Sequence, residues 1–268
     1  MRITMFVLAL ALVSLDSAEA QICGAGPVWN YCTCGGCAVN GPANWARIAN
    51  PACGGGTIPQ SPAALPGAGT YSNIGPLTLH YGTAATLFST ENNASTVKLF
   101  PAAAQFIHLG PLNKRYNLKE LHFHVPAEHV LPGVNAVAEL HLVHEAAGDP
   151  TPVAIAVFLV DSQGAPNNAL VPVLTAVNAI PLCTRRERSV TANLSQIVPS
   201  GLAARFLEYA GSLTTPPCGA VRWIILPQPI PISSVQLGRL NLFGSNARPL
   251  QAPAARVSCY PRSATCVQ

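Results

Sequence analysis

The chain has 268 residues, of which 10% are charged, and its formal net charge is +4. Its basic residues are scattered, so neither a nucleic-acid-binding surface nor a membrane-binding patch is expected. With 21 glycines, 25 prolines and few strong helix formers, the composition favours one β domain with short strands and many turns.

The first twenty residues have the pattern of a secretory signal peptide. Arg2 gives a short basic start, residues 5–15 are apolar, and Ala18-Glu19-Ala20 is a small-x-small cleavage site. The apolar stretch is shorter than the ~20 residues that a spanning helix needs, so no membrane anchor is expected. We predict cleavage after Ala20 and a protein that is secreted, extracellular, or periplasmic or in the cell wall.

Nine cysteines in a secreted chain predict disulfide bonds, and the odd number leaves at least one unpaired or intermolecular. Four of them crowd the N-terminal region: Cys23, Cys32, Cys34 and Cys37. The spacing Cys32-x-Cys34-x-x-Cys37 is compatible with a second metal site, but an oxidising compartment favours disulfides. Cys259 and Cys266 could close a small C-terminal loop, although spacing alone does not fix the connectivity.

Two stretches, residues 118–124 and 139–144, carry the strongest chemical signal. If both are β-strands, alternate side chains share a face, so His122 and His124 point the same way. Neighbouring strands could then bring His122, His124 and His141 together as three nitrogen ligands. That is the ligand set of a catalytic zinc, with a fourth position left open.

A lone His-x-His pair is weak evidence for a metal, since a histidine on a strand is usually packed or solvated. Here a third histidine lies in phase on a second strand, and Glu139 and Val143 share its face, whereas His144 faces away. Glu120 and Glu139 each stand two residues before a histidine of the ligand set. Zinc-bound histidines usually donate their other ring N–H to such a carboxylate or to a carbonyl.

These motifs resemble those of the α-class carbonic anhydrases. The most specific are Glu120-Leu121-His122-Phe123-His124-Val125-Pro126-Ala127-Glu128-His129, Ala138-Glu139-Leu140-His141-Leu142-Val143-His144 and Gly211-Ser212-Leu213-Thr214-Thr215-Pro216-Pro217-Cys218. The similarity extends in the family's order over residues 29–251, through Trp29-Asn30-Tyr31, Asn40-Gly41-Pro42, Gln60-Ser61-Pro62, Val221-Arg222-Trp223 and Asn246-Ala247-Arg248-Pro249.

The resemblance implies a mainly β domain around a large twisted, mostly antiparallel central sheet, with a few short peripheral helices and zinc at the bottom of a cone-shaped cleft. It also implies a disulfide between Cys53 and Cys218. The expected organisation is a signal peptide (1–20), a Cys/Gly-rich N-terminal extension (21–28), a catalytic domain (29–251, with a Cys-rich insertion near 32–39) and a C-terminal tail (252–268).

By the same resemblance, His122, His124 and His141 hold Zn²⁺, with Glu120, Glu139 and the backbone carbonyl of Asn246 as their outer partners. Glu128 is expected to be buried and ionised and to accept the hydroxyl proton of Thr214, which in turn orients zinc-bound hydroxide. The substrate-binding wall is expected from Thr214, Thr215, Leu213, Val143, Val157, Val221 and Trp223.

Two positions depart from the family's pattern. Ser95 stands where many relatives carry a proton-shuttling histidine, and a serine hydroxyl has no pKa near neutrality. Proton export should then depend on buffer or on a water chain, which Tyr31 could steer. Glu120 replaces a glutamine, and we expect its charge to raise the pKa of the zinc-bound water slightly.

The leading hypothesis is a secreted zinc enzyme, a carbonate dehydratase, that interconverts carbon dioxide and bicarbonate. A non-catalytic carbonic-anhydrase-like binding or matrix domain is the main alternative, but such relatives usually lose a metal histidine, and here all three are present. A zinc esterase with another physiological substrate is the third. The partners expected are a small-molecule substrate only, with no nucleic acid and no membrane.

Overall fold

The computed structural model describes residues 20–21, 29–33, 36–67, 70–71, 75–254 and 256–261. Most of the predicted leader lies outside these residues, as do Cys23, Cys34, Cys266 and the side chain of Cys37. Ala20, after which cleavage is predicted, is within them and begins a two-residue strand.

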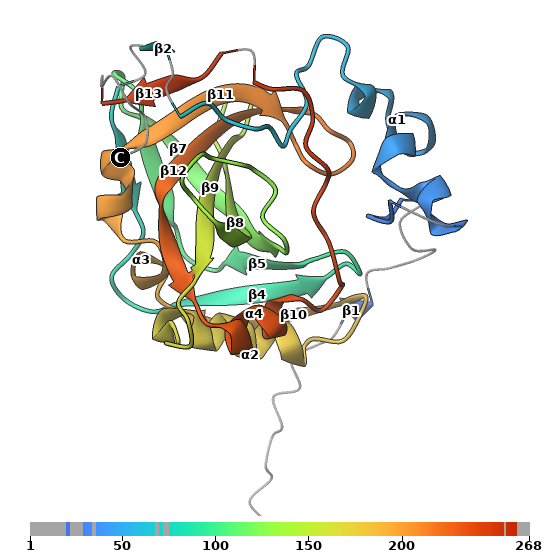
Figure 1. Ribbon diagram of the computed structural model, residues 1–268. Helices are drawn as coiled ribbons and strands as arrows, with labels where there is room; N and C mark the ends of the chain where they lie inside the picture. Colours follow the sequence, from blue (N-terminus) through green and yellow to red (C-terminus); the bar gives the residue numbers. More distant parts are fainter. Residues whose placement is uncertain are drawn as a thin grey trace, which may run out of the picture.

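The described residues form one sheet of 13 strands (Figure 1). Along the sheet the order is β1-β10-β4-β5-β7-β8-β9-β12-β11-β13-β2, and β6 joins both β3 and β7. Only the pairs β9–β12 and β13–β2 are parallel among the described strands, so the prediction of a large, mostly antiparallel sheet is confirmed. The strands are β1 (Ala20–Gln21), β2 (Thr70–Tyr71), β3 (Leu77–His80), β4 (Thr86–Asn92), β5 (Val97–Pro101), β6 (Phe106–Leu109), β7 (Lys114–His124), β8 (Ala136–Glu145), β9 (Val153–Asp161), β10 (Thr184–Ala192), β11 (Phe206–Ser212), β12 (Ala220–Ile232) and β13 (Ser258–Tyr260).

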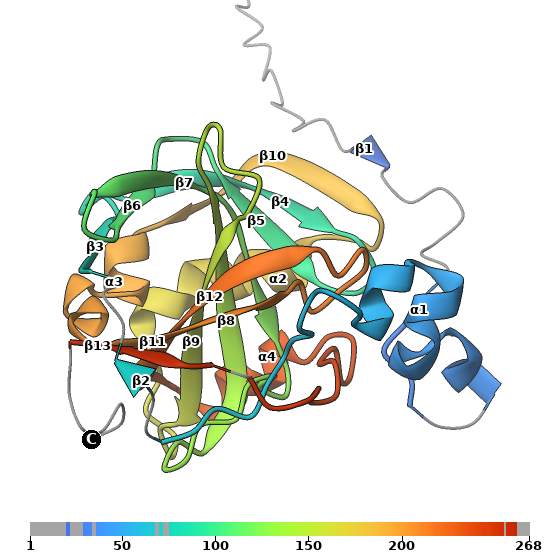
Figure 2. The same ribbon diagram turned by 90° about the horizontal axis from the view of Figure 1, so that it is seen from above.

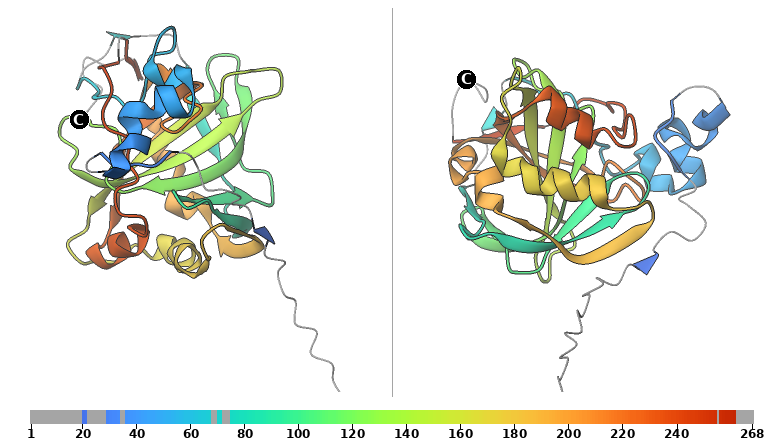
Figure 3. Two further views of the ribbon diagram at one scale, coloured as in Figure 1. Left: turned by 90° about the vertical axis from the view of Figure 1, so that its right-hand side faces the viewer. Right: turned by 90° about the horizontal axis from the view of Figure 1, so that it is seen from below.

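The helices are short and peripheral, as expected. They are α1 (Trp45–Ile48), α2 (Val171–Ala179), α3 (Leu194–Ile197) and α4 (Ser234–Leu240), with 3-10 turns at Gly36–Asn40, Pro42–Asn44, Pro51–Gly54, Asn168–Leu170 and Ser200–Ala204. The view from below shows α2 and α4 side by side across one side of the sheet (Figure 3). No helix in the described part of the chain is long and apolar enough to cross a membrane.

The two faces of the sheet at the central strands β7, β8 and β9 have different surroundings. One face packs the main apolar core, in which Leu121, Leu140 and Ile155 are almost completely buried. The other face carries the polar side chains predicted for the site, because side chains alternate along a strand. In β9 nearly every residue from 153 to 159 is buried, which is typical of a strand covered on both faces.

The N-terminal helical turns sit beside the sheet, where Figure 2 shows them in blue around α1. They are fixed by the disulfide between Cys53 and Cys218, which the resemblance implied and the structure contains. Trp45 is completely buried against this bond. Cys32, Cys183 and Cys259 are also disulfide-bonded. The bond ties the 3-10 turn Pro51–Gly54 to the turn that follows β11.

The C-terminal tail takes part in the sheet. Residues 258–260 form β13, which pairs with β11 through Leu207 and Cys259. The predicted tail over 252–268 therefore contributes a strand to the domain that precedes it.

Replacing both Cys53 and Cys218 by serine should lower the free energy of unfolding by about 3–5 kcal/mol, because the bond constrains a long loop in the unfolded chain. The bond spans 165 residues of sequence. Unfolding in guanidinium chloride, followed by tryptophan fluorescence, measures the difference. An excess of reductant should abolish it, and equal unfolding midpoints without reductant would contradict the expectation.

Candidate metal centre

The register of β7 and β8 brings the three histidines together. His122 lies directly opposite His141, and His124 lies on the same face two residues further along β7. One nitrogen from each ring falls in a group whose atoms all lie within 4.8 Å of one another. The Nε2 atoms of His122 and His124 are 3.0 Å apart.

Each histidine has its other nitrogen bonded to a separate acceptor. His122 Nδ1 lies 2.8 Å from Glu120 Oε2, and His124 Nδ1 lies 2.7 Å from the backbone oxygen of Asn246. His141 uses the opposite atom, because its Nε2 lies 2.7 Å from a carboxylate oxygen of Glu139. These acceptors hold the protons on the outside of the cluster.

The inward nitrogens are therefore unprotonated. Burial lowers the pKa of all three rings, to about 3 for His141, so neutral imidazoles are present at neutral pH. Three converging lone pairs repel one another unless a cation lies between them. Tetrahedral zinc with Zn–N distances of ~2.0–2.1 Å separates its nitrogen ligands by roughly 3.3 Å, so this donor set fits zinc.

Glu139 is the centre of the buried polar network. Its Oε2 accepts from the backbone N–H groups of Glu128 (2.9 Å) and His129 (2.7 Å). Its Oε1 accepts from His129 Nδ1 (2.6 Å) and His141 Nε2 (2.7 Å). Burial opposes the charge, but these bonds hold the pKa of Glu139 well below its usual range. One carboxylate thus fixes both a histidine of the cluster and the loop after β7.

His129 and His144 are structural neighbours of the cluster. His129 is bonded on both sides, since its Nε2 lies 2.6 Å from the Tyr209 hydroxyl. His144 faces away from His141, as the strand alternation predicted, and bonds the Tyr81 hydroxyl at 3.0 Å. His129 also forms a possible ligand group with Glu139 and His141, but its Nδ1 is already turned to Glu139.

Glu128 lies between the histidines and Thr214. The Thr214 side chain lowers the pKa of Glu128, and Glu128 Oε1 accepts from the backbone N–H of Arg248 at 2.8 Å. Its Oε2 lies 3.5 Å from His124 Nε2 and has no hydrogen-bond partner within the described residues. Burial raises the pKa of Glu128 to about 8, and the charge of Glu139 adds to the rise. The expected ionised state therefore requires a nearby cation.

A cavity of about 360 Å³ opens over the three histidines. Val143, Leu213, Trp223, Thr214 and Thr215, which were expected in the substrate-binding wall, line this cavity together with polar residues that include Glu120 and Lys98. Two further residues predicted for the wall, Val157 and Val221, are not among the described residues that line this cavity.

Val157 pairs with Leu140 and packs into the core on the opposite face of the sheet, so its assignment to the wall is wrong. Ala154, which pairs with Val143, takes that place. Val221 lies in the apolar cluster beside Trp223 and is not among the described residues that line the cavity.

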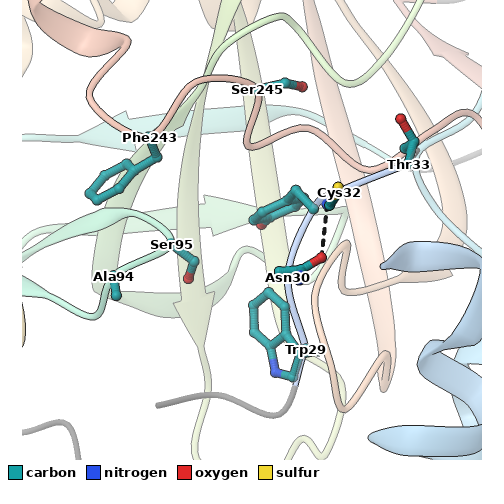
Figure 4. Close-up of a pocket in the computed structure, with 9 residues that line it drawn as sticks. Trp29, Asn30, Cys32, Thr33, Ala94, Ser95, Phe243 and Ser245 are labelled. Atoms are coloured by element: carbon teal, nitrogen blue, oxygen red, sulfur yellow. Dashed lines mark hydrogen bonds between the residues drawn. The ribbon is translucent and has the colours of Figure 1, made fainter. Parts of the chain in front are cut away.

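A second hollow of about 580 Å³ adjoins the cavity and shares Trp29, Tyr31 and Ser95 with it. Figure 4 shows Ser95 on one side of this hollow and Trp29 and Asn30 on the other. Ser95 donates its hydroxyl proton to Asn93 Oδ1 at 2.9 Å. Burial raises the pKa of Tyr31 well above its ordinary value, and its buried hydroxyl has no hydrogen-bond partner in the described part of the chain.

Lys98 and Arg248 are polar residues at the site to which the sequence motifs assigned no role. Lys98 lines the cavity and lies 3.6 Å from Glu120 Oε1. Arg248 belongs to a motif that carried the resemblance, and its guanidinium bonds the backbone oxygens of Ser61 and Cys53 at 2.8 Å. Strand alternation could have placed Lys98 on the polar face, but nothing in the sequence shows that Arg248 reaches Cys53.

The fold and the site together define a class of protein: a large β-sheet domain in which three histidines that could hold a metal line a cavity. The family model described as eukaryotic-type carbonic anhydrase matches residues 40–253. The chain belongs to this family, the α-class carbonic anhydrases.

Individual relatives agree with the family match. The carbonic anhydrase of Nostoc sp. is 32% identical over 60% of this chain, and human carbonic anhydrase 7 is 32% identical over 75% of this chain and 82% of its own length. The chain spans less than two thirds of the Nostoc relative (59%) and of the Pectobacterium atrosepticum carbonic anhydrase (66%).

Solved structures align over more of the chain. The α-carbonic anhydrase of Photobacterium profundum has a TM-score of 0.72 and 27% identity over 86% of this chain and 99% of its own. The enzyme of Thermovibrio ammonificans, solved with the inhibitor sulfanilamide, has a TM-score of 0.72 and 26% identity over 88% of this chain and 99% of its own.

Replacing Glu139 by glutamine should lower the free energy of unfolding by about 2–4 kcal/mol. The amide NH₂ group of glutamine would face N–H groups whose hydrogen bonds the carboxylate now accepts. Urea unfolding at neutral pH measures this loss. Glu145→Gln is the matched control, since Glu145 lies on the same strand with an exposed side chain. Equal losses in the two variants would contradict the role of the Glu139 network.

Proposed function

We propose that this protein catalyses the reversible hydration of carbon dioxide to bicarbonate and a proton, with Zn²⁺ held by His122, His124 and His141. The observation that carries the proposal is the convergence of three unprotonated nitrogens, each fixed by its own outer acceptor. Membership of the carbonic anhydrase family supports the same activity.

When bound, zinc supplies a hydroxide nucleophile near neutral pH, by lowering the pKa of water to about 7 as in the well-known carbonic anhydrase case. The chain's own residues orient that nucleophile. The Thr214 hydroxyl would donate its hydrogen bond to Glu128, so the Thr214 oxygen could only accept a hydrogen bond from the nucleophile. This would fix the orientation of the nucleophile. The positive charge of the metal would favour the ionised form of Glu128 that this role needs.

The wall formed by Val143, Leu213 and Trp223 suits a small apolar molecule. Carbon dioxide has no strong hydrogen-bonding groups, so it can contact these apolar side chains without competing for the polar residues of the cavity. Thr214 and Thr215 line the same cavity, where we expect them to bind the anionic product. Binding and release then occur next to one another in the same cavity.

Proton removal is the step for which many relatives use a histidine at the position that Ser95 occupies in this chain. Ser95 occupies the border between the cavity and the outer hollow, and its hydroxyl is already engaged with Asn93. We infer that protons leave through water or external buffer, past Tyr31, and that this export limits turnover.

The disulfide between Cys53 and Cys218 indicates an oxidising compartment. We propose that the leader over residues 1–20 directs secretion and is removed after Ala20. The mature protein would then begin at Gln21.

Replacing His141 by alanine tests the proposed activity. Stopped-flow measurement of carbon dioxide hydration should show a fall of at least about 100-fold, because catalysis depends on the metal that this ring helps to hold. Zinc content, measured on the same samples, should fall from one equivalent per chain. His108→Ala, on the outer strand β6, is the control that should change neither value. Undiminished hydration by folded His141→Ala would refute the proposal.

Replacing Ser95 by histidine tests proton export. At the lowest buffer concentration this variant should turn over roughly tenfold faster than the natural protein, since an imidazole near neutrality carries protons well. At saturating buffer the two rates should converge. Ser195→His, which adds the same imidazole to the short helix α3, should give no gain. Buffer-independent turnover of the natural protein would contradict the expectation.

A further inference from the structure

Lys98 is a charged residue of the cavity that the proposed mechanism does not use. It lies on β5, next to β7, and its Nζ is 3.6 Å from Glu120 Oε1. The other oxygen of the same carboxylate, Oε2, lies 2.8 Å from His122 Nδ1. The Glu120 carboxylate thus stands between a fixed cation and a histidine of the metal centre.

The separation and the burial indicate how Lys98 acts. At 3.6 Å the ammonium is beyond hydrogen-bond distance, so it influences Glu120 through charge and not by anchoring it. The Glu120 side chain is only 11% exposed, and a buried carboxylate is costly without a compensating charge. Neutral His122 does not supply one, and Lys98 is the only lysine or arginine of the described residues within 4.0 Å of Glu120.

Lys98 also belongs to a row of alternating charges across the sheet. Its partner on β4 is Glu91, and Glu91 in turn lies opposite Arg185 on β10, 3.5 Å away. The row therefore runs from β10 across β4 and β5 to β7, through Arg185, Glu91, Lys98 and Glu120, and ends beside His122. Lys98 thus has an acidic residue on each of its two neighbouring strands, and attraction to both restricts the position of its ammonium group.

We propose that Lys98 offsets the charge of Glu120, so that His122 donates its Nδ1 proton to an ion pair and not to an isolated carboxylate. The pair keeps the net charge beside the metal ligands close to that of the neutral glutamine that the resemblance leads one to expect here. Lys98 is thus a positioning residue that sets how tightly the centre holds its metal. This inference rests on the proposed zinc site.

Zinc release from the purified holoprotein to an excess of a chromophoric chelator tests this role. Lys98→Met removes a positive charge near the dication, so release should be about fivefold slower. Glu120→Gln removes a negative charge while keeping an acceptor for His122, so release should be about tenfold faster. The double variant has a neutral pair again and should release zinc at about the natural rate, as should Lys98→Arg.

A second readout reports directly on His122. The NMR signal of its Nδ1 proton should move downfield in Lys98→Met, because the acceptor becomes a stronger base, and upfield in Glu120→Gln. Lys119→Met is the matched control, since Lys119 lines the same cavity but pairs with Glu145 at 3.5 Å and not with an acceptor of the three histidines. Neither readout should change in that variant.

Changes in the zinc release rate opposite to those expected would overturn the inference. If Lys98→Met releases zinc as fast as the natural protein or faster, or if the double variant does not return towards the natural rate, Lys98 does not offset the charge of Glu120. Such results would not affect the proposed function, provided that the natural protein carries one zinc and hydrates carbon dioxide. A natural protein that retains no zinc would overturn both.

Discussion

The candidate metal centre depends on a buried acceptor behind each of its three histidines. Glu120, the Asn246 carbonyl and Glu139 hold the outer ring protons, and the inner nitrogens are left free to converge. Without these partners the rings could rotate, exchange tautomers or be protonated. The three rings converge because β7 and β8 pair in the register that sets His122 opposite His141. A one-residue slip would turn a strand's site residues into the core.

The three carboxylates around the centre are made different by their surroundings. Glu139 receives four N–H donors and remains ionised although it is fully buried. Burial opposes the charge of Glu120, but His122 and Lys98 still lower its pKa to about 2. Glu128 has fewer partners, and burial raises its pKa to about 8. Two carboxylates therefore hold histidines of the triad in place, and the third would be ionised by a cation bound between them.

Much of this arrangement could be predicted from the sequence, because strand alternation is a local rule. It placed His122 and His124 on one face and His144 on the other, and the resemblance supplied the disulfide at Cys53. The error at Val157 has a physical cause. An apolar strand that is buried on both faces has no polar alternation to set its phase. The contact of Lys98 with Glu120 depends on packing between strands, which no motif records.

Nitrogen-15 NMR of the histidine rings during zinc titration of chelator-treated protein tests the central claim most directly. The account predicts saturation at one equivalent, with zinc on Nε2 of His122 and His124 and on Nδ1 of His141, while the outer nitrogens keep their protons. Zinc on His141 Nε2, or no saturation at one equivalent, would show that the outer acceptors do not define the site.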